Sequence, residues 1–415
     1  MTMNVRETVD VFAATILENT VQHYDWGSTT AIPDLLGATP DGRPAAELWL
    51  GAHPSAPSRL CPPGGGGVVS LADMVGCDPV RTLGPRVVRD FGPRLPFLLK
   101  VLAADRPLSL QVHPDAARAR RGYQEENRTG PAVGHPTRSF HDDQHKPEML
   151  VALTPFEGLA GFRSPRAVRA LLDGLEGDLV RRMRAALDGR APADAMRAAT
   201  ALLVGTRTED SCSAELDRAV ASVARRYEAG SPSARADATV LHLAEQHPGD
   251  PGALVSLLLN RVTLEPGEAM FVPAGEVHAY LSGVGVEVMA ASDNVLRAGL
   301  TSKHVDAPAL LECAGFAPRP PGRPETTVTG SGSVVTTHRA PATEFALTLT
   351  ELAPDDPVGL LSDGPRIVLV LDGHVRLLTG SGELELHQGQ SSFVPHAAGP
   401  VTVDGTGHVV CAWVP

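Results

Sequence analysis

A change of residue pattern along the chain constrains the fold more than any other feature. From Thr20 to about Arg163, short apolar runs alternate with Gly and Pro, which is typical of short strands joined by tight turns. From Ser164 to about Arg261, apolar residues recur every three or four positions, which predicts helices. Turn-rich, alternating sequence then returns. We therefore expect a mainly β protein with an all-α insertion.

The same changes divide the 415 residues into four segments. The β-rich segments 1–163 and 262–319 are expected to form one domain in two parts, interrupted by a helical domain at 164–261. A Pro-rich passage at 317–327 leads into a last β-rich segment, 320–415, whose short strands recur at regular spacing. This spacing predicts a separate small β-sandwich or half-barrel at the C-terminus.

Charge and cysteine content narrow the class of protein. A formal net charge of -12 and a pI of about 5.7 argue against nucleic acid or an anionic membrane as the main partner. The longest apolar runs, such as 253–259, are far shorter than the ~20 residues that span a bilayer. The 5 cysteines are scattered and never in C-x-x-C spacing, which favours a reducing compartment. We expect a soluble cytoplasmic protein.

The stretch PLSLQVHPD at 107–115 raises the first question of function. Its apolar and polar residues alternate, as in a strand with one apolar and one polar face. Gln111 and His113 lie two residues apart and therefore project from the same face. A lone pair of this kind is most simply a solvent-exposed face. The alternative is a pair of metal ligands, which requires further ligands elsewhere in the chain.

Two other segments carry side chains that can bind a metal. HDDQHKPEM at 141–149 includes Glu148, and PAGEVHAY places His278 just after a tight turn. With Gln111 and His113 they would supply two imidazoles, one carboxylate and one amide. This mixed set suits Zn²⁺ and excludes a structural site built from thiolates.

Several longer segments together resemble a known family. In order along the chain they are QHYDWGS (22–28), AELWLGAHPSAPS (46–58), PFLLKVLAADRPLSLQVHPD (96–115), HKPEMLVALTPFEGLAGFR (145–163) and EPGEAMFVPAGEVHAYLSGVGVEVMAASDNVLRAGLTSKHVD (265–306). They are similar to the type I mannose-6-phosphate isomerases, or phosphomannose isomerases, which are zinc enzymes of the cupin superfamily. The resemblance implies a cupin (jelly-roll) barrel as the catalytic domain and a cupin-like β-sandwich at the C-terminus. That sandwich carries His387 and His396 but no Q-x-H pair with a Glu, so we expect it to be a degenerate cupin without metal.

The resemblance also implies the reaction and the ligands. The expected activity is the interconversion of D-mannose 6-phosphate and D-fructose 6-phosphate through an enediol. One Zn²⁺ per chain would be held by residues that fall on Gln111, His113, Glu148 and His278. The polar face of the 107–115 strand would then line a pocket inside the barrel instead of facing solvent.

Moving a proton between C1 and C2 of the sugar requires an acid or base and stabilisation of the negative enediolate. By similarity, Asp293 and Arg297 border the pocket, and Arg297 provides a cation for the developing charge. For that pair the alternative is an ordinary ion pair. His145 and Lys146 are candidates for proton transfer. The candidates for phosphate binding are Lys100, Ser109 and Lys303, and for these, as for His145 and Lys146, the alternative is a solvated surface group.

Two other functions fit a fold of this kind. A cupin dioxygenase with Fe²⁺ would also use His and carboxylate ligands, but a fourth protein ligand such as Gln111 argues against the open positions that oxygen chemistry needs. A non-enzymatic sugar-binding bicupin would explain the fold but not the coexistence of Arg297, Asp293 and Lys146 with the ligand set. The sequence further suggests a monomer or a weak homo-oligomer.

Overall fold

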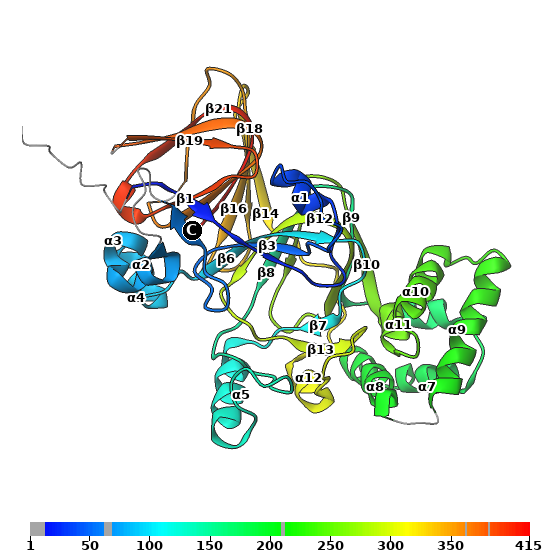
Figure 1. The fold of residues 1–415 in the computed structure, drawn as a ribbon. Coiled ribbons are helices and arrows are strands. Elements are labelled where there is room, and N and C mark those ends of the chain that lie inside the picture. The colour runs from blue at the N-terminus through cyan, green and yellow to red at the C-terminus, as the bar shows by residue number, and fades with distance from the viewer. Residues whose placement is uncertain (1–12, 62–68, 209–211, 362, 381) are drawn as a thin grey trace, which may run out of the picture. The chain divides into compact units, whose positions relative to one another are not determined.

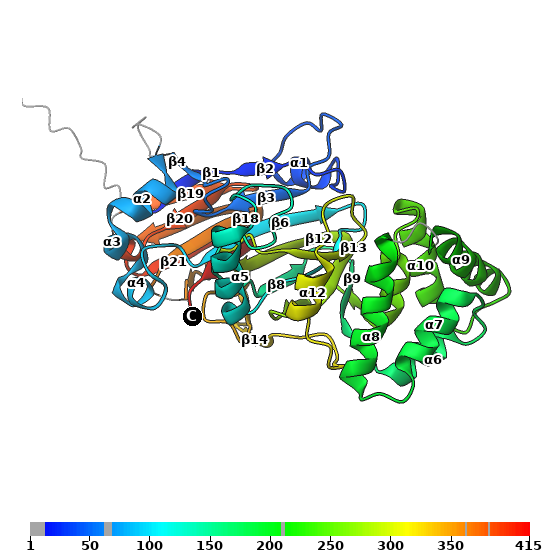
Figure 2. The same cartoon turned by 90° about the horizontal axis from the view of Figure 1, so that it is seen from below.

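A computed structural model describes residues 13–61, 69–208, 212–361, 363–380 and 382–415. The chain falls into two compact units, each described here by itself. They are Met1–Ala103 with Gly285–Ala291 and Pro324–Pro415, and Ala104–Val284 with Ser292–Arg323. The expected mainly β architecture with a helical insertion is confirmed by the order of the elements (Figures 1 and 2). The division of the four segments into three domains stays a prediction.

The first unit contains an 11-stranded antiparallel sheet. Its path runs β14-β15-β16-β21-β18-β20-β1-β4-β5, with β17 beside β21 and β19 beside β18. The bounds are β1 (Thr15–Glu18), β4 (Arg59–Cys61), β5 (Val69–Ser70), β14 (Glu325–Thr329), β15 (Val334–Arg339), β16 (Ala346–Leu352), β17 (Val358–Gly359), β18 (Arg366–Thr379), β19 (Gly382–His387), β20 (Ser391–Val394) and β21 (Val401–Trp413). Since β1 pairs with β20, the two ends of the described chain are joined in one sheet.

Alternation along β18 separates a core face from an exposed face. Val370, Val375 and Leu377 are fully buried in one apolar cluster, whereas His374 is exposed. The register shifts between Val370 and Asp372, and this irregularity changes which residues point inward along the strand. The part of β18 beyond the shift therefore presents a row of polar side chains to solvent.

The remaining elements of the first unit are three paired strands and several short helices. Strand β3 lies between β2 and β6 in antiparallel register, and Trp49 on β3 faces Lys100 on β6. The bounds are β2 (Thr20–Gln22), β3 (Glu47–Leu50), β6 (Phe97–Ala104), α1 (Ala31–Leu35), α2 (Leu71–Cys77), α3 (Pro79–Leu83), α4 (Pro85–Phe91) and the 3-10 turn η3 (His396–Ala398).

The second unit contains short strands around the candidate ligands and a group of helices. Strand β9 pairs with β10 and β12, β7 pairs with β12 and β13, and β8 pairs with β11. The strand bounds are β7 (Leu110–Val112), β8 (Glu148–Ala152), β9 (Phe156–Phe162), β10 (Leu259–Leu264), β11 (Ala269–Val272), β12 (His278–Ala290, of which the residues up to Val284 lie in this unit) and β13 (Leu296–Gly299).

The helical insertion forms where the sequence predicts it. Ser164 caps the first helix by accepting a hydrogen bond from the backbone N–H of Ala167, and Pro165 occupies the first turn. The helices gather in one group in both views of Figures 1 and 2. The bounds are α6 (Pro165–Leu172), α7 (Asp178–Leu187), α8 (Pro192–Gly205), η1 (Thr206–Thr208), α9 (Cys212–Glu228), α10 (Ala234–Gln246), α11 (Gly252–Val255) and η2 (Ser256–Leu258).

The sequence-based boundaries need two corrections. Helical structure was expected to about Arg261, but it ends at Leu258 and strand β10 begins at Leu259. A short buried apolar run does not distinguish a strand from a helix by periodicity alone. Several helices lie in segments that the sequence pattern predicts to be strand-like. They include α2, α3, α4, α5 (Ala116–Thr129) and α12 (Ala307–Cys313). Across the described ranges, no helix combines the length and apolarity needed to cross a membrane.

Candidate metal centre

Three antiparallel strands bring three of the candidate site residues, Arg297, Gln111 and His278, into one row. On the central strand β7, Leu110 and Val112 are fully buried in the core, so Gln111 between them points to the other face. The register sets Gln111 opposite His278 on β12 and opposite Arg297 on β13. Directly opposed residues on neighbouring strands have Cβ atoms about 4.5–5.5 Å apart. The row Arg297–Gln111–His278 therefore follows from strand pairing alone.

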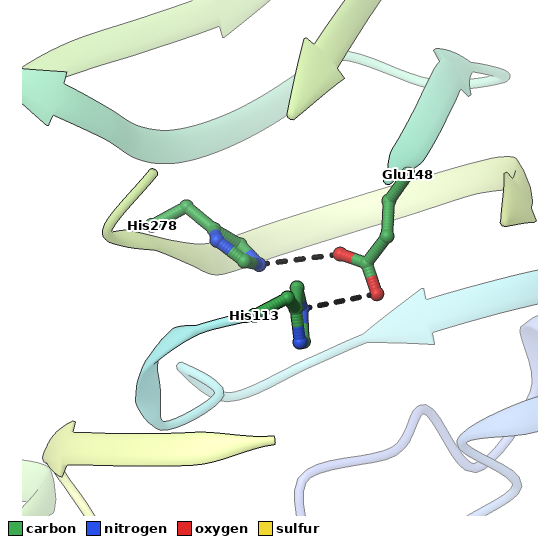
Figure 3. Close-up of side chains that lie close together, drawn as sticks. All are labelled: His113, Glu148 and His278. Atoms are coloured by element: carbon green, nitrogen blue, oxygen red, sulfur yellow. Dashed lines mark ion pairs between the residues drawn. The ribbon is translucent and has the colours of Figure 1, made fainter. Parts of the chain in front are cut away.

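His113, Glu148 and His278 converge on one point of the second unit (Figure 3). Nε2 of His113 lies 3.2 Å from Oε1 of Glu148, and Nε2 of His278 lies 3.3 Å from Oε2 of the same carboxylate. Both imidazoles are completely buried, and Glu148 is 2% exposed. The cluster is thus a dry His–Glu–His arrangement whose ligand atoms lie within 4.8 Å of one another.

Backbone carbonyls set the tautomer of both histidines. Nδ1 of His113 lies 2.7 Å from the carbonyl oxygen of Asn294, and Nδ1 of His278 lies 3.1 Å from that of Glu276. A carbonyl oxygen can only accept, so each Nδ1 carries a proton, and in the neutral form of each imidazole the Nε2 lone pair points at the carboxylate. Nε2 of His113 and Oε2 of Glu148 accordingly have no hydrogen-bond partner. Buried lone pairs facing one another without a proton are what a bound cation resolves.

The pKa values describe the same electrostatics. Burial lowers the pKa of His113 to about 4, so its imidazole is neutral at pH 7. Burial alone would raise the pKa of Glu148, but His113 and Lys146 outweigh it and hold that pKa well below its usual value. For His278, burial is outweighed by the hydrogen bond and charge of Glu148, which raise its pKa. A carboxylate and a neutral imidazole are the forms that bind metal.

Gln111 and Lys146 complete the immediate surroundings. Nε2 of Gln111 lies 3.1 Å from Nε2 of His278, so the amide already reaches the cluster, and rotating the amide would present its oxygen as a fourth ligand atom. Nζ of Lys146 lies 3.2 Å from Oε1 of Glu148, and Lys146 is 6% exposed. All four predicted ligands are therefore brought together, with a buried cation at the edge of the group.

A network of hydrogen bonds between two loops, which the sequence did not predict, supports the backbone carbonyl that binds His113. The carboxylate of Asp142 accepts hydrogen bonds from the Ser292 hydroxyl, from the Asp293 backbone N–H and from the Asn294 side-chain amide. Oδ1 of Asn294 in turn accepts from the backbone N–H of His141 at 2.8 Å. Because the Asn294 carbonyl holds Nδ1 of His113, this network fixes the orientation of a candidate ligand. The only signal was the acidic content of the 141–149 segment.

The other predicted site residues of the second unit lie on loops outside the strands and helices. His145 and Ser109 are half-buried, one beside Lys146 and the other just before β7. Asp293 and Lys303 are exposed. Of these residues, Asp293 is tied directly to the network, since its backbone N–H bonds Asp142 at 2.8 Å.

Lys100 belongs to the first unit, where it is 6% exposed. Its Nζ lies 3.5 Å from Oε1 of Glu47 and 3.6 Å from Oε2 of Glu287. The ring of Trp49 is 5.0 Å away, and its indole N–H donates to Glu47. Glu47 and Glu287 were not predicted, because each stands in an apolar strand with no local pattern that marks it.

Comparison with known proteins assigns the chain to a family. A model of the phosphomannose isomerase type I catalytic domain matches residues 15–165, and a model of the mannose-6-phosphate isomerase cupin domain matches residues 335–414. Mannose-6-phosphate isomerase from Escherichia coli K12 is 38% identical over 394 residues, which cover 95% of this chain and 97% of that protein. The chain belongs to the type I phosphomannose isomerase family. The predicted family, cupin architecture and enzyme class are confirmed.

Members of this isomerase family match along nearly the whole chain. Mannose-6-phosphate isomerase 1 from Arabidopsis thaliana is 33% identical over 401 residues, covering 91% of this chain and 88% of that protein. A solved structure described as mannose 6-phosphate isomerase, holo and zinc bound, superposes with a TM-score of 0.86 at 34% identity, covering 97% of this chain and 99% of that chain. The predicted zinc cofactor thus has two supports, the buried His–Glu–His cluster here and zinc in a related structure.

Proposed function

We propose that the chain interconverts D-mannose 6-phosphate and D-fructose 6-phosphate through an enediol, at a site built on the buried His113–Glu148–His278 cluster. The observation that carries the proposal is the convergence of two buried imidazoles on one buried carboxylate, where Nε2 of His113 and Oε2 of Glu148 have no hydrogen-bond partner. Residues with this geometry and no thiolate suit a zinc ion. We assign Gln111, His113, Glu148 and His278 as the ligands of one Zn²⁺.

Once bound there, zinc would supply Lewis-acid polarisation of the sugar oxygens. The residues of the chain position the ligand atoms and exclude water. Glu148 and the two imidazoles hold their ligand atoms in place because strand pairing and the carbonyl contacts fix them. The buried location excludes bulk water, which strengthens every charge interaction at the site.

Arg297 is assigned to the charge that develops during the reaction. This assignment is supported by the strand register, in which Arg297 is the direct partner of Gln111. A guanidinium stays charged near pH 7 and donates in a fixed fork, which matches the two adjacent oxygens of an enediolate. Asp293 precedes Arg297 by four residues, in the loop before β13, and borders the pocket in this assignment.

Proton transfer between C1 and C2 is assigned to the His145–Lys146 segment. The Lys146 ammonium is held at Glu148 and can donate to a sugar oxygen bound at the cluster. We assign to the half-buried His145, directly before it in the sequence, the transfer of the carbon-bound proton to the neighbouring carbon.

Substrate binding is assigned to Ser109, Lys303 and Lys100, with different tasks. The exposed Lys303 and the Ser109 hydroxyl suit the phosphate group. Lys100 is already flanked by the carboxylates of Glu47 and Glu287, which would repel a phosphate dianion. Lys100 therefore stays a candidate for substrate binding, but not for the phosphate.

The setting of this activity is part of the same proposal. We infer a cytoplasmic monomer or weak homo-oligomer that acts on a free sugar phosphate, with no nucleic acid or membrane partner. A net charge of -12 and thiols at Cys61, Cys77, Cys313 and Cys411 that form no disulfide support it.

The direct test is turnover of mannose 6-phosphate by protein stripped with a chelator and reloaded with Zn²⁺, Co²⁺, Mn²⁺ or Fe²⁺. We expect stripped protein to be inactive and zinc to restore formation of fructose 6-phosphate. Full activity after complete stripping would overturn the metal assignment. Oxygen uptake by the iron-loaded protein, in place of isomerisation, would favour the dioxygenase alternative.

A further inference from the structure

A second group of metal-capable side chains lies on the exposed face of the C-terminal strands. His374 on β18 is the direct antiparallel partner of His387 on β19. Their ring centroids are 4.4 Å apart, and the ring planes differ by 11°. Glu385 precedes His387 by two positions on β19, so its carboxylate projects from the same face. The ligand atoms of His374, Glu385 and His387 all lie within 4.8 Å of one another.

The neighbouring charged residues pair with one another and not with the three candidate ligands. Arg376 is the register partner of Glu385, but its guanidinium binds Asp404 and lies 3.5 Å from Oε1 of Glu383. Within the ranges that the structure describes, the side chains of His374, Glu385 and His387 make no hydrogen bond or ion pair. Two imidazoles and a carboxylate thus lie together on the surface of the sheet, and among the described residues no other polar side chain binds them.

We propose that His374, Glu385 and His387 form a second metal site, which binds a borderline divalent cation such as Zn²⁺. Two imidazole nitrogens and one carboxylate oxygen are a three-ligand set that zinc uses, with water completing the coordination. The paired strands hold the three Cα atoms at fixed spacing, and the exposed side chains can turn to bring their ligand atoms together. The inference does not rest on the proposed reaction.

The exposure of the site determines how it behaves. All three ligands are open to solvent, so each keeps its hydration and rotamer freedom until the metal arrives. The site therefore fills after the buried cluster and only when zinc exceeds one equivalent. Its occupancy adds a second zinc to the chain without taking part in catalysis.

The test is equilibrium dialysis of zinc-loaded protein against increasing Zn²⁺, with metal counted by mass spectrometry and turnover measured alongside. We expect the wild type to bind about two zinc ions per chain. His387→Ala and Glu385→Gln should bind the second ion at least about tenfold more weakly, because losing an outer partner of a ligand alone costs 10–100-fold in affinity. Both variants should keep their first zinc and their full turnover.

His408→Ala is the matched control. His408 is exposed in the same C-terminal sheet, but its Nδ1 is held by Asp372 at 2.8 Å, and it is not part of the cluster. This variant should still bind two zinc ions. The proposal is overturned if the wild type binds only one, if His387→Ala and Glu385→Gln bind the second ion as tightly as the wild type, or if His408→Ala weakens it equally.

Discussion

The chain carries the same three side-chain types, His, Glu and His, in two different environments. In His113–Glu148–His278 every side chain is buried, and two backbone carbonyls fix the tautomers. In His374–Glu385–His387 every side chain is exposed. The comparison teaches that a ligand set becomes a reaction centre through burial and preorganisation, since only then are lone pairs desolvated and aimed before the metal binds.

Removing a ligand from the buried cluster should produce the largest effect. His278→Ala deletes one ligand and leaves the Glu148 charge buried beside a single imidazole. We expect a loss of at least about 100-fold in zinc affinity, with turnover lost in parallel. Zinc content after dialysis and the coupled isomerase assay measure both.

His338→Ala is the control for deleting a buried imidazole. His338 is 1% exposed, its ring bonds Thr326 at 3.0 Å in the first unit, and it is not one of the candidate ligands. This variant should lose stability but keep zinc and turnover. If His278→Ala also kept its zinc and its turnover, the buried cluster would have only a structural role, and the proposed difference between the two clusters would be wrong.

Arg297→Ala tests whether the buried cluster serves catalysis and not only sugar binding. The variant should fold and retain zinc, because Arg297 is not a ligand. Losing one preorganised donor to a developing charge typically costs about 10²–10³-fold in rate, so kcat should fall by that order with a smaller change in KM. Arg297→Lys should recover only part, since an ammonium lacks the fork.

Arg261→Ala, on strand β10, provides the comparison, because Arg261 is paired with Glu157 at 2.8 Å and has no assigned role at the site. It should leave kcat unchanged. An Arg297→Ala enzyme with normal kcat and a raised KM alone would make Arg297 a phosphate anchor.

The loop network should have an intermediate effect. Asp142→Ala removes the acceptor for the Ser292 hydroxyl and for the Asp293 backbone N–H, which weakens the loop that holds the Asn294 carbonyl against His113. We expect zinc affinity to fall by about 10–100-fold, as for other outer partners of metal ligands. Asp143→Ala, the exposed neighbour in the sequence, should bind zinc normally. Equal affinities for the two variants would remove the network from the account.

The smallest predicted effect is the pH dependence of zinc affinity at the buried cluster. In the metal-free protein the pKa of His278 is raised above 6.5, that of His113 is about 4, and that of Glu148 is well below 4.5. Near pH 6, zinc must therefore displace one proton, from His278, and affinity should fall about tenfold for each pH unit lowered. Calorimetry in buffers of different ionisation enthalpy counts these protons. Release of two would show that His113 is also protonated in the free site.

The sequence predicted the parts of this site that depend on local pattern. Alternation from Leu108 to His113 correctly put Gln111 and His113 on one face, and Ser164 marked the start of the helical insertion. The apolar run ending in Leu259 did not reveal where helix gives way to strand, because both are buried there. Periodicity cannot separate the two in so short a run.

Contacts between distant segments could not be predicted in the same way. The bonds from Asp142 to Asn294 and the pairing of Lys100 with Glu287 depend on how loops and strands far apart in the sequence meet. The exposed cluster depends likewise on the register of β18 and β19, which sets His374 opposite His387. A one-residue slip in that register would move one of the two imidazoles to the core face.

Anomalous diffraction at the zinc edge, from crystals of wild-type protein grown with one equivalent of Zn²⁺, tests the central claim most directly. The account predicts a single strong peak about 2.0–2.2 Å from Nε2 of His113, from Nε2 of His278 and from a carboxylate oxygen of Glu148. No peak at this position, or one at His374, Glu385 and His387 instead, would contradict it.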